Sequence, residues 1–212
     1  MTEGPVTQGP MSQGPMTRRL ITPKRVHWPH VPPQRWRNGG GLTRELLAFP
    51  AGDSWQVRIS VADIEADGPF SAFPGVQRWF TVLQGAGVEL DIDGQVQRLH
   101  RGDPPLCFDG AARVDCRLVD GPTRDLNFML RAADGRLEAA VDGQAWTPAA
   151  AHCGLFSAVA GVCKSDAQQH AVAPYTLLWF DRAPASLNFT AAQRPAGLIG
   201  WWMAATHHPL AT

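Results

Sequence analysis

The sequence predicts an all-β protein whose strands form a sandwich or a barrel. From about residue 19 onward, short segments alternate apolar and polar residues, and Gly, Pro and Asp interrupt them at intervals of roughly ten residues. No long stretch has the 3.6-residue period of an amphipathic helix. Roughly ten or more strands are expected, too many for one small sheet, and closed barrels or stacked sheets avoid exposed edges.

Alternation places the individual strands. Residues 55–61 carry Trp, Val and Ile at every second position, and residues 88–92 repeat this pattern before Asp93-Gly94, a hairpin turn that leads into residues 96–99. Leu126, Phe128 and Leu130 alternate in the same way with more polar neighbours. Further strands are expected at residues 43–49, 79–83, 155–162, 175–180, 186–189 and 198–203.

Composition limits the classes of function. The chain has 212 residues, of which 44% are hydrophobic and 18% charged, so a packed domain is expected. Lys plus Arg and Asp plus Glu both number 19 and form no basic block, so nucleic acid is not an expected partner. The longest apolar stretch, around residues 198–205, is under half of a membrane span. We therefore expect no membrane partner and a cytoplasmic location.

The first eighteen residues differ from the rest. They repeat a five-residue unit that contains Gly-Pro and offers few groups able to fill a core. We expect residues 1–18 to be a disordered tail and residues 19–212 to be the folded domain.

A glycine-rich loop is the densest local signal. Asn38 and Thr43 flank Gly39, Gly40 and Gly41, and three glycines in a row permit backbone conformations and close approaches that other residues do not. The loop has two interpretations: a turn that leads into the next strand, or a ligand site in which Asn38, Thr43 and free glycine N–H groups bind an anion.

The segment 66–87 resembles the first motif of a cupin, because a strand ends in Gly-x-Gly before the next hairpin. The His-x-His pair and carboxylate that ligate a metal in cupins are absent there, and Arg78 is present instead. A guanidinium does not bind a metal ion, but it can hold a carboxylate by two parallel hydrogen bonds. An exposed or ion-paired arginine is the alternative.

Each of two expected strands has a pair of polar side chains on one of its faces. Asp125 and Asn127 form the pair on one strand, and Arg58 and Ser60 form the pair on the other. Such faces suit either a pocket wall or an exposed sheet surface, and alternation does not say which face points into a barrel. The four cysteines and seven histidines form no zinc or catalytic spacing. We expect no metal and no cofactor.

In order, Trp-Arg-Asn-Gly-Gly-Gly-x-Thr-x-Glu, Arg-Ile-Ser, Asp-Gly-Pro-Phe-Ser-x-Phe-Pro-Gly-x-x-Arg and Asp-Leu-Asn resemble the HutD/Ves family. The resemblance covers roughly residues 20–205 and is strongest before residue 131. It implies a metal-free double-stranded β-helix (RmlC-like cupin) barrel present twice in one chain, with halves at about 19–131 and 132–212. It also implies regulation of histidine utilisation by binding an intermediate such as formylglutamate or formiminoglutamate.

Two functions follow from these observations. The first is a regulator or sensor that binds a small carboxylate or amide through Asn38, Gly39, Gly40, Thr43, Arg58, Ser60, Arg78, Asp125 and Asn127. The alternative is a metal-independent cupin enzyme, a hydrolase or isomerase acting on a small acid or amide, with Asp125 as general base and the glycine loop stabilising negative charge. Whether the chain forms a homodimer stays open.

Overall fold

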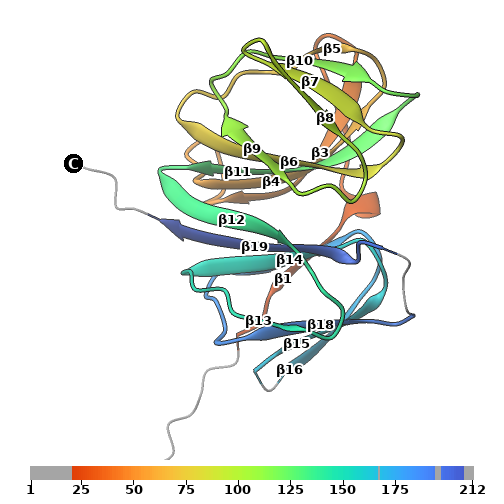
Figure 1. The fold of residues 1–212 in the computed structure, drawn as a ribbon. Helices are drawn as coiled ribbons and strands as arrows, with labels where there is room; N and C mark the ends of the chain where they lie inside the picture. The colour runs from red at the N-terminus through yellow and green to blue at the C-terminus, as the bar shows by residue number, and fades with distance from the viewer. Residues whose placement is uncertain (1–20, 167, 194–196, 208–212) are drawn as a thin grey trace, which may run out of the picture.

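The computed structural model describes residues 21–166, 168–193 and 197–207, and the tail predicted at residues 1–18 lies outside this part. The described residues form strands and one 3₁₀ turn, η1 (Trp28–His30), with no α-helix among them. The predicted all-β class is confirmed. Figure 1 shows two stacked β units, the upper one from the first part of the chain and the lower one mostly from the second.

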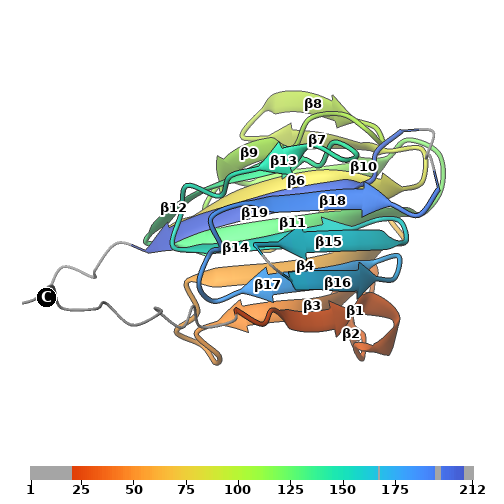
Figure 2. The same ribbon diagram turned by 90° about the horizontal axis from the view of Figure 1, so that it is seen from below.

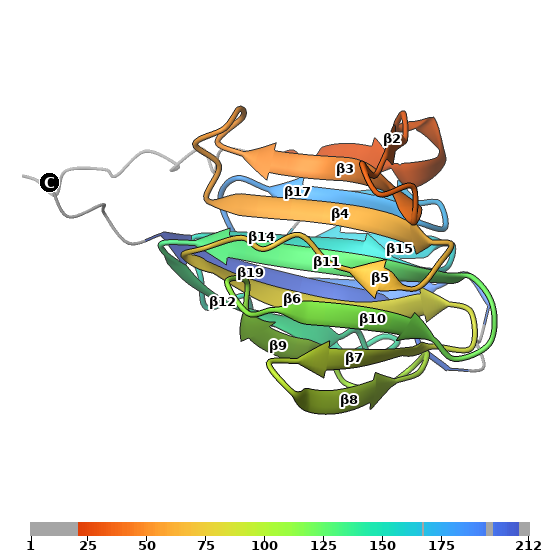
Figure 3. The same cartoon turned by 90° about the horizontal axis from the view of Figure 1, so that it is seen from above.

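The first unit contains eight consecutive strands that fold into a two-sheet barrel. Strands β4, β11, β6 and β9 form, in that order, most of a six-stranded sheet, and β5, β10, β7 and β8 form a four-stranded sheet. Figure 3 shows the smaller sheet lying across the larger one. The bounds are β4 Val57–Ile64, β5 Gly68–Pro69, β6 Val76–Gln84, β7 Val88–Ile92, β8 Gln95–Leu99, β9 Leu106–Asp109, β10 Val114–Leu118 and β11 Thr123–Arg131.

The next eight strands repeat this connectivity. Strands β12, β19, β14 and β17 lie side by side in a five-stranded sheet, and β13, β18, β15 and β16 form a four-stranded sheet, which Figure 2 shows from below. Because strand n of the first set corresponds to strand n+8 of the second, the expected double cupin in one chain is confirmed. The bounds are β12 Ala133–Ala139, β13 Ala145–Trp146, β14 His152–Ser157, β15 Gly161–Ser165, β16 Gln168–Val172, β17 Thr176–Phe180, β18 Leu187–Ala191 and β19 Gly200–His207.

The three strands at the start of the described chain extend the large sheets. Strand β3 (Gly41–Phe49) pairs with β4, and β2 (Gln34–Arg35) pairs with β3, both in the first unit. Strand β1 (Lys24–His27) instead pairs with β17 of the second unit, where Figure 1 shows it in red within the lower half. The segment between β1 and β2 therefore joins the two barrels.

The largest hydrophobic core lies between the two barrels. Val57, Ile59 and Val61 of β4 pack in one cluster with Trp179 and Trp201 of the second unit. The apolar faces predicted at residues 57–61 and 126–130 thus point toward the other barrel, while Trp55 packs in a separate small cluster with Val76 and Met129. The interior of each barrel has a cluster of its own. The polar faces of the same strands consequently point into the first barrel.

Two local predictions had different outcomes. The hairpin turn at Asp93-Gly94 is confirmed, because both residues have positive φ angles, 49° and 85°, as a tight hairpin requires. The single strand predicted at 155–162 is wrong, because β14 ends at Ser157 and β15 begins at Gly161. An uninterrupted apolar run hid this turn, which is stabilised by bonds from Ser157 Oγ to the carbonyl of Val159 and from the Ala158 N–H to Ile199. None of the described helices is long and apolar enough to span a membrane.

Candidate functional site

A pocket of about 460 Å³ opens inside the first barrel. Seven of the nine residues predicted for a ligand site line it, from five separate stretches of the chain: Asn38, Thr43, Arg58, Ser60, Arg78, Asp125 and Asn127. Gly39 and Gly40 do not line this pocket. The volume lies within the range of small-molecule sites, so a metabolite-sized ligand fits.

Strand alternation explains why polar groups gather here. In β11, Leu126 and Phe128 pack toward the second barrel, which turns Asp125 and Asn127 inward. Ser60 on β4 lies opposite Asn127 in the strand pairing, so the polar faces of the two strands are adjacent. Behind these groups, an apolar cluster that includes Phe80, Val82 and Leu90 fills the rest of the first barrel.

A buried chain of hydrogen bonds crosses the base of the pocket. Arg78 Nε donates to Asn127 Oδ1 at 2.7 Å, and Asn127 Nδ2 donates to Asp125 Oδ2. The three residues are 7%, 3% and 1% exposed, respectively. Asn127 therefore separates the guanidinium from the carboxyl group, and no Arg78–Asp125 ion pair within 4.0 Å occurs among the described residues.

Arg78 is placed to receive an anion. Its guanidinium lies over the rings of Phe70 and Phe108, 4.7 and 5.4 Å from their centroids. Burial lowers the pKa of Arg78 to about 10, partly offset by the charge of Asp125. Within the described part of the chain, only Nε has a hydrogen-bond partner, although a guanidinium has five N–H donors. The two terminal nitrogens are thus available to a carboxylate in the pocket.

Asp125, the acidic residue of the pocket, is affected by burial in the other direction from an exposed carboxylate: its protonated form is favoured. Burial raises the pKa of Asp125 to about 8, while the Arg78 charge and the bond from Asn127 act in the other direction. Its Oδ1 is buried without a hydrogen-bond partner among the described residues. At neutral pH this side chain is therefore mostly an uncharged carboxylic acid.

Arg58 also lines the pocket, but its charge is compensated. Its Nε donates to Glu45 Oε2 at 2.7 Å, and its Nη1 lies 3.8 Å from Met129 Sδ. Phe73 lies 5.9 Å from the guanidinium carbon. Because Glu45 already neutralises it, Arg58 is a weaker candidate than Arg78 for binding an anion.

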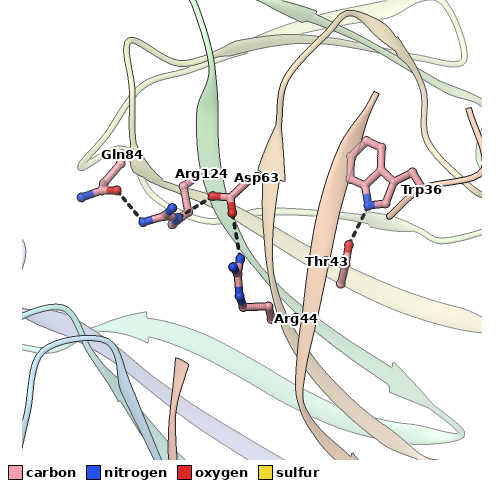
Figure 4. Close-up of polar contacts among 6 residues, drawn as sticks. All are labelled: Trp36, Thr43, Arg44, Asp63, Gln84 and Arg124. Atoms are coloured by element: carbon pink, nitrogen blue, oxygen red, sulfur yellow. Dashed lines mark hydrogen bonds and ion pairs between the residues drawn. The ribbon is translucent and has the colours of Figure 1, made fainter. Parts of the chain in front are cut away.

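The glycine loop is a structural turn at the rim. Gly39 N–H donates to the carbonyl of Trp36 and Gly40 N–H to Asn38 Oδ1, both at 3.0 Å. These two N–H groups are therefore not free to bind an anion, as one interpretation of the sequence required. A Cβ on Gly41 would lie 2.4 Å from the carbonyl oxygen of Asp63, so only glycine fits there. The loop positions Trp36, whose Nε1 donates to Thr43 Oγ1 at 2.7 Å (Figure 4).

A second polar group lies outside the pocket, and the sequence patterns did not indicate it. Asp63 on β4 accepts bonds from Arg44 on β3 at 3.0 Å and from Arg124 on β11 at 2.5 Å, and Arg124 also donates to Gln84 on β6 (Figure 4). Both arginines stack on Trp28, with distances of 4.6 and 3.9 Å to its ring. These contacts tie four strands of the pocket sheet to the segment that joins the barrels.

Aromatic lining residues were also missed. Trp36, Phe70 and Phe73 border the pocket, and Phe70 packs edge-on to Trp36 at 6.2 Å. The signal that could have found the two phenylalanines is the Asp-Gly-Pro-Phe-Ser-x-Phe-Pro-Gly segment, which is too rich in turn residues to be a strand yet carries two large apolar side chains.

The donor set of the pocket does not fit a metal ion. Its polar lining residues are four arginines, two serines, a threonine, two asparagines, a glutamine and one carboxyl group, with no imidazole or thiolate among them. No group of three or more His, Cys, Asp or Glu able to hold an ion occurs within residues 21–166, 168–193 and 197–207. We derive no chemistry through a metal at this site.

The fold and the site together define a double-cupin protein with a charged pocket in its first barrel. The sequence profile described as HutD matches residues 29–197. The chain therefore belongs to the HutD family, and the predicted resemblance is confirmed.

Relatives and solved structures agree. An uncharacterized 21.2 kDa protein in the hutC 3′ region of Pseudomonas putida is 41% identical over 104 residues, which span 48% of this chain and 53%, about half, of that protein. Protein Ves of Citrobacter koseri is 33% identical over 133 residues, 62% of this chain and 70% of its own. The structure of HutD from Pseudomonas fluorescens SBW25, in a formate condition, has a TM-score of 0.75 at 29% identity and covers 89% of this chain and 100% of its own.

More distant structures support the fold alone. A mutant of Bacillus subtilis oxalate decarboxylase has a TM-score of 0.62 at 9% identity, over 90% of this chain and 79% of its own. This similarity supports the cupin fold of the chain and gives no information about a reaction.

Proposed function

We propose that this protein binds a small carboxylate in its first barrel and acts as a regulator or sensor linked to histidine utilisation. The observation that carries the proposal is Arg78, a buried guanidinium whose two terminal nitrogens face a pocket without a partner among the described residues. An isolated buried charge is costly unless a ligand of opposite charge compensates it. A carboxylate provides that charge and matches the planar fork of the arginine.

The charge balance of the pocket supports one anionic group at its base. Glu45 neutralises Arg58, and Asp125 is mostly uncharged at neutral pH because burial raises its pKa. Arg35 and Arg37 also line the pocket but are exposed, so Arg78 supplies the buried positive charge that has no ion pair among the described residues. Ser60 and Thr43 provide hydroxyl groups along the wall, which suit a formyl or amide group on the same ligand.

The proposed ligand class is an acylated acidic amino acid of the formylglutamate or formiminoglutamate type. The relative in the hutC 3′ region and the HutD neighbour support the link to histidine utilisation through their names. An acid of this class has two carboxylates: one binds Arg78, and the other lies with the formyl or formimino group toward the exposed Arg35 and Arg37.

Calorimetric titration tests this proposal. Formylglutamate, formiminoglutamate, glutamate and urocanate are titrated at pH 6 into the wild type, Arg78→Lys, Arg58→Lys and Arg136→Lys, the last as a control in the second barrel. Lysine keeps the charge of Arg78 but loses its fork, so affinity should fall by about 1.5 to 3 kcal/mol. Arg136→Lys should bind as the wild type does. If none of the four acids binds the wild type, the ligand class is wrong.

A second candidate is a metal-independent enzyme, and one observation favours it. Asp125 is a buried carboxyl group whose pKa of about 8 is close to working pH, as general acid–base catalysis requires. The glycine loop does not support this function, because the N–H groups of Gly39 and Gly40 are bonded within the turn. Proton NMR of each acid with the protein separates the two functions: an enzyme consumes the acid at a rate that Asp125→Asn abolishes, whereas a sensor leaves it intact.

A further inference from the structure

The position of Asn127 between Arg78 and Asp125 has a consequence for binding. The asparagine uses both ends of its amide, accepting from Arg78 Nε and donating to Asp125 Oδ2. A direct ion pair between Arg78 and Asp125 would leave the pocket without net charge. The interposed amide instead keeps the terminal nitrogens of Arg78 for the ligand.

We propose that the pocket binds a carboxylate anion with Asp125 in its protonated form, taking a proton from solvent wherever Asp125 is ionised beforehand, and that Asn127 is the positioning residue that holds Asp125 away from the fork of Arg78. This inference rests on the proposed function and adds the protonation state that the ligand selects. Asp125 is thereby a specificity-determining residue, because only its neutral form allows a ligand carboxylate to bind beside Arg78 without repulsion between two negative charges.

The surroundings of Asp125 favour the neutral form when an anion is present. The nearest groups that act on it are Arg78 on β6, Asp63 on β4 and Cys116 on β10, with Arg58 on β4 and Asp67 before β5 acting on those neighbours. Four arginines line the pocket, and two of them are paired, Arg58 with Glu45 and Arg35 with Glu65. Arg37 is exposed to solvent, so Arg78 is the buried cation without an ion pair among the described lining residues. An anion bound to Arg78 removes the charge that stabilises ionised Asp125 and adds a second negative charge nearby.

The direction of the pH effect follows. Below pH 8 Asp125 already holds its proton, so anion binding needs no proton uptake and affinity is at its highest. Above pH 8 the free site is ionised, each anion must bring a proton, and affinity falls by up to about tenfold per pH unit. Formylglutamate is fully ionised throughout pH 6 to 9, so the ligand does not contribute to this change.

Calorimetry of formylglutamate at pH 6 and pH 9, in two buffers of different ionisation enthalpy, measures affinity and proton uptake together. For the wild type we expect affinity to be about tenfold weaker at pH 9, with proton uptake near zero at pH 6 and approaching one per ligand at pH 9. Asp125→Asn is neutral at every pH, so its affinity should be the same at both. Asp181→Asn, a matched change at an exposed carboxylate that follows β17 in the second barrel, should keep the dependence of the wild type. Asn127→Asp places a carboxylate beside Arg78 and should weaken binding at pH 6 by more than about tenfold.

The outcomes distinguish the inference about Asp125 from the proposed function of carboxylate binding. Equal wild-type affinity at both pH values without proton uptake overturns the inference and leaves the proposed function standing, as does a pH dependence that persists in Asp125→Asn. If that variant does not fold, proton uptake by the wild type still decides. Absence of binding by all four titrated acids at pH 6 overturns both the inference and the proposed function.

Discussion

The two barrels share one connectivity but differ in what fills them. In the second barrel, Leu155, Phe189 and Trp202 pack in the interior, and Trp146 stacks on Trp202 at 5.0 Å. In the first barrel, Ser60 on β4 is paired with Asn127 on β11, whereas on the corresponding strands of the second barrel Glu138 is paired with Trp202. The same eight-strand scaffold therefore makes either a solid core or a pocket, depending on a few inward-facing side chains.

This difference indicates that the second barrel contributes mainly to stability and the first barrel to ligand binding. Buried aromatic side chains contribute stability, whereas buried polar groups and empty space reduce it and are retained where a ligand binds. We infer that the second barrel supports the first, through the shared core between their large sheets and through the contacts of Trp28. The predictions below test that division.

The largest effect is expected in the second barrel. Trp202 is 2% exposed and its ring is stacked, so Trp202→Ala should lower the free energy of unfolding by about 3 to 5 kcal/mol. Urea denaturation measures this loss, and titration of the folded variant should show the affinity of the wild type for an acid. A large loss of affinity with little loss of stability would mean that the ligand binds in the second barrel, contrary to our proposal.

The next effect is the pH dependence of stability caused by Asp125. Burial raises its folded-state pKa to about 8, above roughly 3.9 in the unfolded chain, so the folded state holds the proton more tightly. The favourable contribution of protonated Asp125 to the free energy of unfolding is complete below about pH 4 and is lost as the pH rises to 8. Between pH 5 and 8 the wild type should lose about 2 to 4 kcal/mol relative to Asp125→Asn. Parallel stability profiles for the two proteins would show that Asp125 is ionised throughout.

Filling the first barrel should make it resemble the second. Arg78→Met, Asn127→Leu and Asp125→Leu together replace the buried polar chain with apolar groups, which should abolish binding and raise the free energy of unfolding by about 1 to 4 kcal/mol. Thermal melts and titration measure both. A triple variant that is less stable than the wild type would mean that the polar chain holds the barrel together.

The smallest effect is expected at the start of the chain. Deletion of residues 1–18, the Gly-Pro repeats, should leave the melting temperature unchanged within about one degree, because a sequence with so few core-forming groups contributes little to stability. A loss of several degrees would mean that this segment packs on a barrel.

The strands and the candidate site were largely predictable, but the direction of each face was not. Alternation in β4 and β11 separated Val61 and Leu126 from Ser60 and Asn127, yet it does not say which set lies inside a barrel. The usual assignment puts apolar residues inside. Here they face a second barrel, because two sheets pack against each other, and that contact joins residues far apart in the sequence.

Other features depend on long-range pairing. No local pattern indicates that β1 joins β17 or that Asp63 bonds to two arginines, since those partners are distant in the chain. The turn between β14 and β15 was missed for the opposite reason: its residues are as apolar as the strands beside it. Cytoplasmic location and the absence of a cofactor remain predictions from sequence.

NMR of the protein with ¹⁵N-labelled arginine tests the central claim most directly, since it reports on the Arg78 guanidinium itself. On addition of formylglutamate at pH 6, the Arg78 Nε and Nη resonances should shift and sharpen as the fork binds the carboxylate, while those of Arg136 in the second barrel should stay in place. Arg78→Lys assigns the signals. Binding that shifts Arg136 and leaves Arg78 unchanged would contradict the account.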